Sequence, residues 1–92
     1  MMFAKPLRER VIRGEITRSV RIWQTPRVRI GGRYPLGGGH IEVTHITEVD
    51  IGDVDERLAR ETGFESLEAL LAVARHGRGE RVFLVDFQYR EG

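Results

Sequence analysis

Residues 14–23 read GEITRSVRIW and join a basic, helix-like segment to the first predicted strand. Gly14 is a natural helix terminator, because glycine adopts the left-handed conformation at a helix end without strain. Beyond it, polar and apolar residues alternate as far as residue 23, which is typical of a β-strand. The alternation places two sets of side chains on opposite faces: Val20 and Ile22 on one, and Ser19, Arg21 and Trp23 on the other. The polar face is the first candidate for a functional surface.

The neighbouring segments predict a short helix, a second strand and a turn. Residues 6–14 (PLRERVIRG) begin with proline, which suits a first helical turn, and carry a narrow apolar stripe. Residues 27–30 (RVRI) alternate like a strand, so their valine and isoleucine are expected inward and Arg27 and Arg29 outward. Residues 31–39 (GGRYPLGGG) predict a turn or loop, most simply a hairpin, because their proline cannot donate to a central ladder.

Residues 40–51 (HIEVTHITEVDI) form the longest predicted strand. Apolar residues occupy alternate positions as far as Val43 and resume at Ile46 with the opposite parity. Both sets can face the core only if an extra residue is inserted between them. We therefore expect a β-bulge or bend near Thr44–His45.

Two helices and a last strand complete the predicted elements. Residues 53–62 begin at Asp53, a candidate N-cap that has a glutamate three residues on. Residues 66–76 begin at Ser66, another good N-cap, and carry a leucine stripe at helical spacing. Residues 80–90 alternate like a strand, and we expect their aromatic side chains in the core. These are Phe83, Phe87 and Tyr89.

This order of elements predicts an α+β fold in a single domain that spans residues 1–92. The last strand follows a helical pair, so it must pair with strands that are distant in the sequence. We expect a small mixed β-barrel with an N-terminal helix and a helical pair before the last strand. Closure of the barrel would protect the edges that a short open sheet exposes.

Composition excludes several classes of protein. No apolar run approaches the ~20 residues of a membrane-spanning helix, and the N-terminus lacks the pattern of a signal peptide. The absence of cysteine excludes disulfides and thiolate metal sites and agrees with a cytoplasmic location. The three histidines share no recurring spacing, and the glycine-rich segment lacks a phosphate-binding lysine. We therefore expect no metal, no cofactor and no membrane partner.

Charge is distributed unevenly along the chain. Residues 1–33 carry nine basic and two acidic side chains, whereas residues 41–68 carry nine acidic and two basic ones. Either these two halves pair with each other in the fold, or the basic half faces a polyanion. The sequence leaves both arrangements open.

Arginine makes up fourteen of the fifteen basic residues, and the chain contains no asparagine. Such a composition is typical of a thermophile or of a GC-rich genome. On the thermophile interpretation we expect a thermal midpoint above the ~45–65 °C of mesophilic domains, because charge networks lose less to desolvation as temperature rises. Melting followed by circular dichroism tests this expectation, and a midpoint of about 50 °C would contradict it.

Three features of the chain occur together: a basic helix that ends in IRGEITRSVR, an arginine-rich strand, and TGFESLEALL ahead of RVFLVDFQY. In this combination they resemble the ASCH domain of the PUA-like superfamily. The resemblance covers almost the whole chain and implies a β-barrel with helices packed beside it. It also implies a role in RNA binding, translation or RNA metabolism. Some relatives remove the acetyl group from acetylated cytidine, and a ribonuclease activity has been proposed for others.

The family signature GxKxxExR is half present in this chain. Gly14 and Arg21 match it, whereas Ile16 stands at the lysine position and Ser19 at the glutamate position. In the hydrolase branch, a lysine and a threonine at these two positions and a later glutamate supply the chemistry, so Ser19 keeps the hydroxyl. The later carboxylate would be Glu61 or Glu65. An isoleucine can neither take a proton nor stabilise an oxyanion, and the sequence therefore favours binding over catalysis.

We predict an RNA-binding module that holds single-stranded or structured RNA on an arginine-rich strand face and in a cleft. The predicted contacts are Lys5, Arg13, Arg18, Ser19, Arg21, Trp23, Arg27 and Arg29. Arginine binds phosphate through a planar pair of donors, and Trp23 either stacks on an extruded base or belongs to the core. The alternatives are a small amidohydrolase acting on acetylated cytidine or a similar modified nucleoside, and a regulatory domain that binds an acidic protein.

Overall fold

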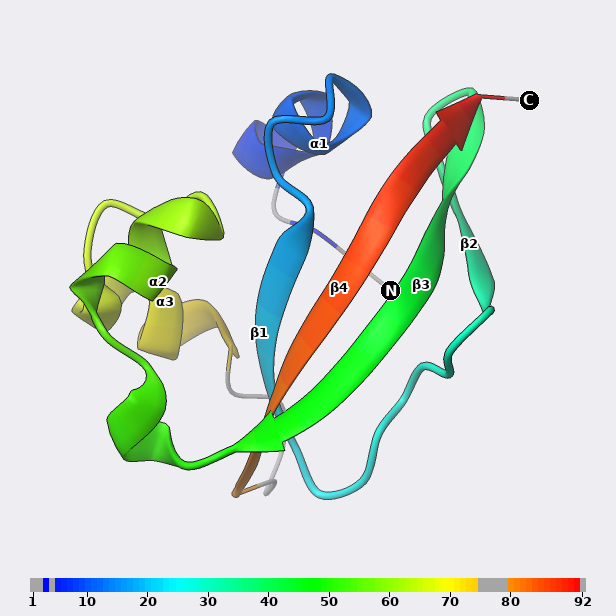
Figure 1. The fold of residues 1–92 in the computed structure, drawn as a ribbon. Coiled ribbons are helices and arrows are strands. Elements are labelled where there is room, and N and C mark those ends of the chain that lie inside the picture. Colours follow the sequence, from blue (N-terminus) through cyan, green and yellow to red (C-terminus); the bar gives the residue numbers. More distant parts are fainter. Residues whose placement is uncertain (1–2, 4, 75–79, 92) are drawn as a thin grey trace.

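In the computed structural model, which describes residues 3, 5–74 and 80–91, four antiparallel strands form one curved sheet shaped like a half-barrel (Figure 1). The strand order across the sheet is β1-β4-β3-β2. The strands are β1 (Arg18–Trp23), β2 (Arg33–Leu36), β3 (Gly39–Val49) and β4 (Arg81–Glu91). The helices are α1 (Lys5–Ile12), the 3-10 helix η1 (Ile51–Asp53), α2 (Glu56–Glu61) and α3 (Leu67–Ala74).

The last strand of the chain is an inner strand of the sheet. β4 pairs with β1 on one side and with β3 on the other, so the predicted α+β class and the non-local pairing are confirmed. Among the described strands, β1 and β2 are the two edges. The expected closure into a full barrel is therefore absent from the described sheet, which remains a half-barrel.

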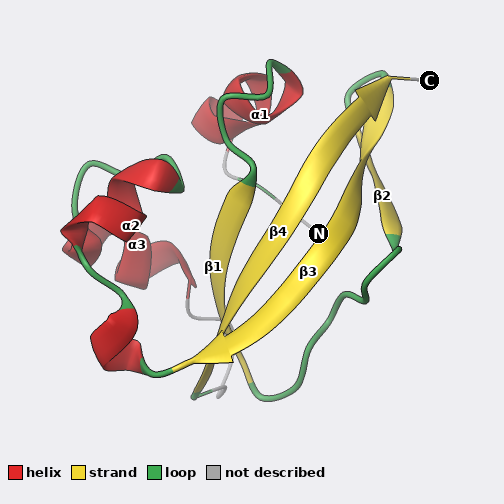
Figure 2. Cartoon of the chain, in the orientation of Figure 1, coloured by secondary structure: helices red, strands yellow, loops and turns green. Residues whose placement is uncertain are grey.

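One face of the sheet packs against α2 and α3, which lie on the same side of it (Figure 2). The shared core consists of Val20, Ile22, Val54, Ala59, Leu70, Ala74 and Val82. Val20 and Ile22 alternate with residues of the opposite face, as the sequence predicts, but both faces of β1 are covered. Burial of this apolar surface is what fixes the helical pair on the sheet.

The opposite face, which we call the aromatic face, packs against Phe3, α1 and the loop after β1. Its core contains Phe3, Val11, Ile16, Trp23, Val28, Ile41, Val43, Phe83, Val85 and Phe87. The ring centroids of Phe3 and Phe87 lie 5.4 Å apart, and those of Trp23 and Phe83 lie 6.0 Å apart. The predicted burial of Phe83 and Phe87 is confirmed, and Tyr89 packs against the same core.

The predicted bulge is confirmed in β3. The register against β4 shifts between Val43 and His45, so one residue of β3 has no partner position on the facing strand. Thr44 lies at the bulge, and its hydroxyl donates to the carbonyl oxygen of Asp86 at 3.2 Å. After the shift, Ile46 pairs with Val85 and faces the aromatic core again.

Residues 27–30 are not a strand, which corrects the sequence-based expectation. Val28 is buried beside Trp23 as expected, but Ile30 is 64% exposed and Arg27 and Arg29 project into solvent. Here the chain crosses from β1 at one edge of the sheet to β2 at the other. Individual hydrogen bonds hold the crossing segment in place, and it forms no ladder with a neighbouring strand. Gly31 donates to the carbonyl oxygen of Val43 at 2.7 Å.

The glycine-rich segment contains a short strand that the sequence analysis assigned to a loop. β2 pairs with β3, and Pro35 lies within it opposite His40. Proline is tolerated there because β2 is an edge strand and needs no donor on its free side. Gly37, with a φ of 59°, makes the turn of the predicted hairpin into β3.

Both helices of the pair form, although the N-cap of the first lies two residues later than expected. The N-cap of α2 is Asp55, whose carboxylate accepts from the amide of Leu58 at 2.8 Å. Asp53 instead closes the preceding 3-10 turn. Ser66 caps α3 as predicted, since its hydroxyl oxygen accepts from the amide of Ala69 at 3.1 Å. The predicted end of that helix, residues 75–76, lies outside the described residues.

No helix in the described part of the chain is long and apolar enough to cross a bilayer.

The helix α1 contains proline in its first turn, and Gly14 follows it with a φ of 78°. The predicted helix and its glycine terminator are therefore confirmed.

Gly63 is expected to tolerate no side chain. Its φ is 97°, and a Cβ there would lie 2.6 Å from Cδ1 of Ile16 and 2.7 Å from Cδ2 of Leu7. We expect Gly63→Ala to reduce the free energy of unfolding by about 2–4 kcal/mol, since backbone strain and overpacking act together. Urea denaturation measures the loss. Gly52→Ala is the matched control, because a Cβ there meets no atom within 4 Å, and an equal loss in both variants would contradict the assignment.

Candidate nucleic-acid interface

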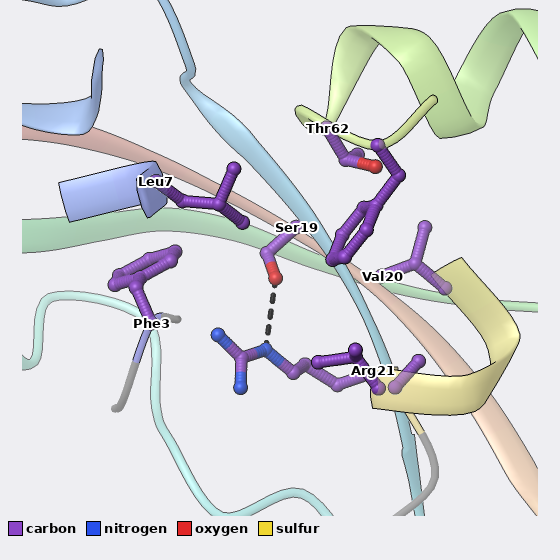
Figure 3. Close-up of a pocket in the computed structure, with 9 residues that line it drawn as sticks. Phe3, Leu7, Ser19, Val20, Arg21 and Thr62 are labelled. Carbon is purple, nitrogen blue, oxygen red and sulfur yellow. Dashed lines mark hydrogen bonds between the residues drawn. The ribbon is translucent and has the colours of Figure 1, made fainter. Parts of the chain in front are cut away.

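A pocket opens at the edge of the sheet, where α1 and the helical pair approach β1 from opposite sides. Its cavity volume is about 30 Å³, within a wider opening of about 340 Å³ that includes solvent at the mouth. It is lined by Phe3, Leu7, Ser19, Val20, Arg21, Thr62, Phe64, Val73 and Ala74 (Figure 3). Because β1 is an edge strand, side chains from both of its faces reach the pocket wall. The pocket is therefore a product of the sheet edge and the two helical layers beside it.

Arg21 supplies the charge of the pocket, although it is only 8% exposed. Its Nε donates to the hydroxyl oxygen of Ser19 at 2.8 Å, and its guanidinium carbon lies 5.2 Å from the ring centroid of Phe3 (Figure 3). Desolvation by burial lowers the pKa of Arg21 to about 10. The side chain is still a cation at neutral pH, and it is held in place by a hydroxyl and an aromatic ring.

The remaining walls are mostly apolar. Thr62 lines the pocket, and its hydroxyl donates to the carbonyl oxygen of Ala59 at 3.0 Å. No carboxylate and no imidazole of the described residues lines the pocket. Its chemistry is therefore that of one buried cation and two hydroxyls in an apolar, partly aromatic enclosure.

Two predicted site residues, Ser19 and Arg21, come together in this pocket as the strand alternation indicated. Sequence reasoning missed most of the other walls. They are Phe3, Leu7, Thr62, Phe64, Val73 and Ala74. Phe3 and Phe64 are single aromatic residues next to the ends of predicted helices, outside the apolar stripes of those helices. This is the only sequence feature that pointed to them, and it is weak.

Trp23 belongs to the core, which was one of its two interpretations. The side chain is 4% exposed, packs against Phe83 and Val28, and does not line the pocket. A base could stack on its ring only if the core around it opened. The stacking surface expected from the sequence is therefore not displayed by this fold.

The other predicted RNA contacts fall into two groups. Arg18 lies 2.7 Å from Asp86 and 3.9 Å from Glu61, and Arg13 lies 2.6 Å from Glu15. The side-chain hydrogen bond to Asp86 raises the pKa of Arg18. By contrast, Lys5, Arg27 and Arg29 are exposed and form no ion pair with a described residue.

Pairing between the basic and acidic halves is only partial. Among the described residues, two ion pairs join the halves, Arg18 with Glu61 and Arg33 with Glu42 at 3.5 Å. The exposed cations near the N-terminus and in the loop after β1 are thus left to face solvent or a polyanion.

The residues that could catalyse hydrolysis do not lie together in one site. Ile16, at the lysine position of the signature, is 2% exposed and packs in the aromatic core. Glu61 pairs with Arg57 and Arg18, and Glu65 is exposed; neither lines the pocket that contains Ser19. No group of three histidine, aspartate or glutamate side chains in the described residues is placed to hold a metal ion.

Comparisons with family models, with curated proteins and with solved structures found no match to this chain. The resemblance to the ASCH domain is therefore carried by the quoted residues alone and remains a prediction.

Proposed function

We propose that this chain is an RNA-binding module of the ASCH/PUA-like type. The observation that carries the proposal is the pocket at the edge of β1, where Arg21 and Ser19 lie against aromatic and apolar walls. A nucleobase has apolar faces and hydrogen-bonding edges, so its chemistry matches that of these walls. The two polar residues belong to the segment that resembles the family signature, which supports the same assignment.

Exposed cations outside the pocket supply the phosphate contacts. Arg27 and Arg29 lie in the loop that follows β1, and this loop is anchored by the buried side chain of Val28. The amide of Arg29 also donates to the hydroxyl of Tyr34 at 3.1 Å. A loop held at several points can present its arginines to a phosphate backbone with little ordering cost.

We expect single-stranded RNA to bind with an affinity that falls steeply as salt increases, because each neutralised phosphate releases counterions. The double variant Arg27→Ala, Arg29→Ala is expected to reduce the slope of log affinity against log salt by about 1.4, or ~0.7 for each lost phosphate contact. Fluorescence anisotropy with a short labelled RNA at several salt concentrations measures the slope.

Arg57→Ala is the control for this experiment. Arg57 is also exposed, but it lies on α2 and pairs with Glu61, so its loss should leave the slope unchanged. If the loop variant and the control behave alike while RNA still binds, the loop does not contact the backbone. If RNA fails to bind the wild-type protein at low salt, the proposal itself is wrong.

A small amidohydrolase is the second candidate, because the Ser19 hydroxyl lines the pocket beside a cation that could stabilise an oxyanion. Ser19 has no carboxylate, lysine or histidine of the described residues beside it in the pocket to act as its base. Release of acetate from acetylated cytidine, abolished by Ser19→Ala, would establish this function in place of simple binding. Binding of an acidic protein with no affinity for RNA would establish the regulatory alternative.

A further inference from the structure

We propose that Tyr34 positions Arg29 for contact with a phosphate of the bound RNA. This inference rests on the proposed RNA binding and goes beyond it, because it gives the two exposed arginines of the loop after β1 different roles. The sequence places Arg27 and Arg29 on the same face of an alternating segment and makes no distinction between them.

The backbone of Arg29 is fixed on both sides. Its amide donates to the hydroxyl oxygen of Tyr34 at 3.1 Å, and its carbonyl oxygen accepts from the amide of Gly32 at 3.0 Å. The residue before it, Val28, is buried in the core of the aromatic face. The exposed side chain of Arg29 therefore extends from a segment whose peptide groups and direction are already set.

Tyr34 is itself held by the fold, so its hydroxyl oxygen is a fixed acceptor. It lies in β2 opposite Ile41, and its ring packs against both core clusters of the aromatic face. The ring also lies close to Gly32, where a Cβ would be 2.5 Å from the hydroxyl oxygen and 2.9 Å from the carbonyl oxygen of Arg29. The absence of a side chain at Gly32 is what lets Tyr34 and the loop meet this closely.

Arg27 has no comparable support. Its side chain is exposed like that of Arg29, but its backbone forms no hydrogen bond with another described residue. A side chain on a less restrained backbone loses more conformational entropy when it is ordered against a ligand. Arg29 should therefore lose less entropy on binding a phosphate than Arg27 does, and Tyr34 is the residue that provides this advantage.

Tyr34→Phe tests the positioning role, because it removes the hydroxyl and keeps the ring in the core. We expect the affinity for a short single-stranded RNA at fixed salt to fall by about threefold, the effect of losing one partly exposed neutral hydrogen bond. The slope of log affinity against log salt should stay unchanged, since both arginines remain. Fluorescence anisotropy at several salt concentrations measures both quantities, and circular dichroism shows that the variant is folded.

A double-mutant cycle assigns the effect to one arginine. In an Arg29→Ala background, Tyr34→Phe should cause no further loss of affinity, whereas in an Arg27→Ala background the loss of about threefold should persist. Tyr89→Phe is the matched control, because the Tyr89 hydroxyl donates to the carbonyl oxygen of Leu36 at 3.1 Å and forms no hydrogen bond with Arg29. This variant should keep the affinity of wild type.

The outcomes separate this inference from the function on which it rests. If wild type and Tyr34→Phe bind RNA with equal affinity, or if the loss persists in the Arg29→Ala background, the chain binds RNA but Tyr34 does not position Arg29. An equal loss in Tyr89→Phe would also overturn the inference. If wild type binds no RNA at low salt, the proposed function is wrong and this inference fails with it.

Discussion

Trp23→Ala is expected to reduce the free energy of unfolding by about 3–5 kcal/mol, the largest loss anticipated for a single substitution in this chain. The indole is 4% exposed and lies between Val28 and Phe83, with Val43 and Val85 in the same cluster. Truncation would leave a cavity at the end of β1 and would also release the buried anchor of the loop that carries the exposed arginines. The loss is a large share of the ~5–15 kcal/mol that stabilises a typical domain.

Urea denaturation at neutral pH measures this loss, and Trp23→Phe is the matched control. Phenylalanine retains most of the apolar surface and can still contact Phe83, so its cost should stay below about 2 kcal/mol. A stability change under 1 kcal/mol or so for Trp23→Ala, together with weakened RNA binding, would restore the interpretation of Trp23 as an exposed stacking surface.

Arg21→Met is expected to raise the stability of the fold and to weaken RNA binding. Methionine keeps an unbranched apolar stem of similar reach and removes the buried charge. Because burial lowers the pKa of Arg21, the charged form opposes folding, and its removal should raise the free energy of unfolding at pH 7 by on the order of 1–3 kcal/mol. RNA affinity should fall by about tenfold or more, since a guanidinium contact of 1–3 kcal/mol or so is lost.

The stability difference between Arg21→Met and wild type should change with pH in a defined direction. The pKa of Arg21 is about 10 in the folded chain and higher in the unfolded chain, where the guanidinium is in water. At neutral pH both states are protonated, and the cost of burying the charge is fully present. Above about pH 10 the unfolded chain binds more protons than the folded one, so this cost decreases as pH rises.

The difference in unfolding free energy between Arg21→Met and wild type should therefore be larger at pH 7 than above pH 10. All other titratable groups are the same in both proteins, so their effects cancel in the difference. If Arg21→Met is less stable than wild type at pH 7, the interactions of Arg21, among them the hydrogen bond to Ser19 and the contact with Phe3, outweigh desolvation. Equal RNA affinity of the two proteins would remove Arg21 from the binding site.

Local patterns in the sequence were sufficient for most of the elements. The change of parity between Val43 and Ile46 predicted the bulge in β3, because side chains alternate strictly along a strand. The caps at Gly14 and Ser66 were correct for a similar reason, since each depends only on its own backbone and the next few residues. Residues 27–30 have the same alternation and are nevertheless a loop.

The loop and the short strand β2 depended on the tertiary structure. Alternation shows that a segment can be half-buried, but a strand also needs a partner with free hydrogen-bonding groups. β3 pairs along its edge with Arg33–Leu36, which come directly before it in the hairpin. Pro35 is accepted there because the outer side of β2 stays unpaired in the described sheet. Neither fact can be read from the residues of the segment itself.

The candidate site, like the fold, was predicted from the sequence only in part. The sequence by itself determined that Ser19 and Arg21 share one face of a strand and stand in a basic segment, because both properties follow from spacing and residue type. Only the tertiary structure decided that this strand is an edge, that Phe3 and Phe64 line the same pocket beside it, and that Arg21 is buried while Trp23 lies in the core. Burial and proximity between distant segments depend on how the helices pack around the sheet, and this packing is a property of the whole chain.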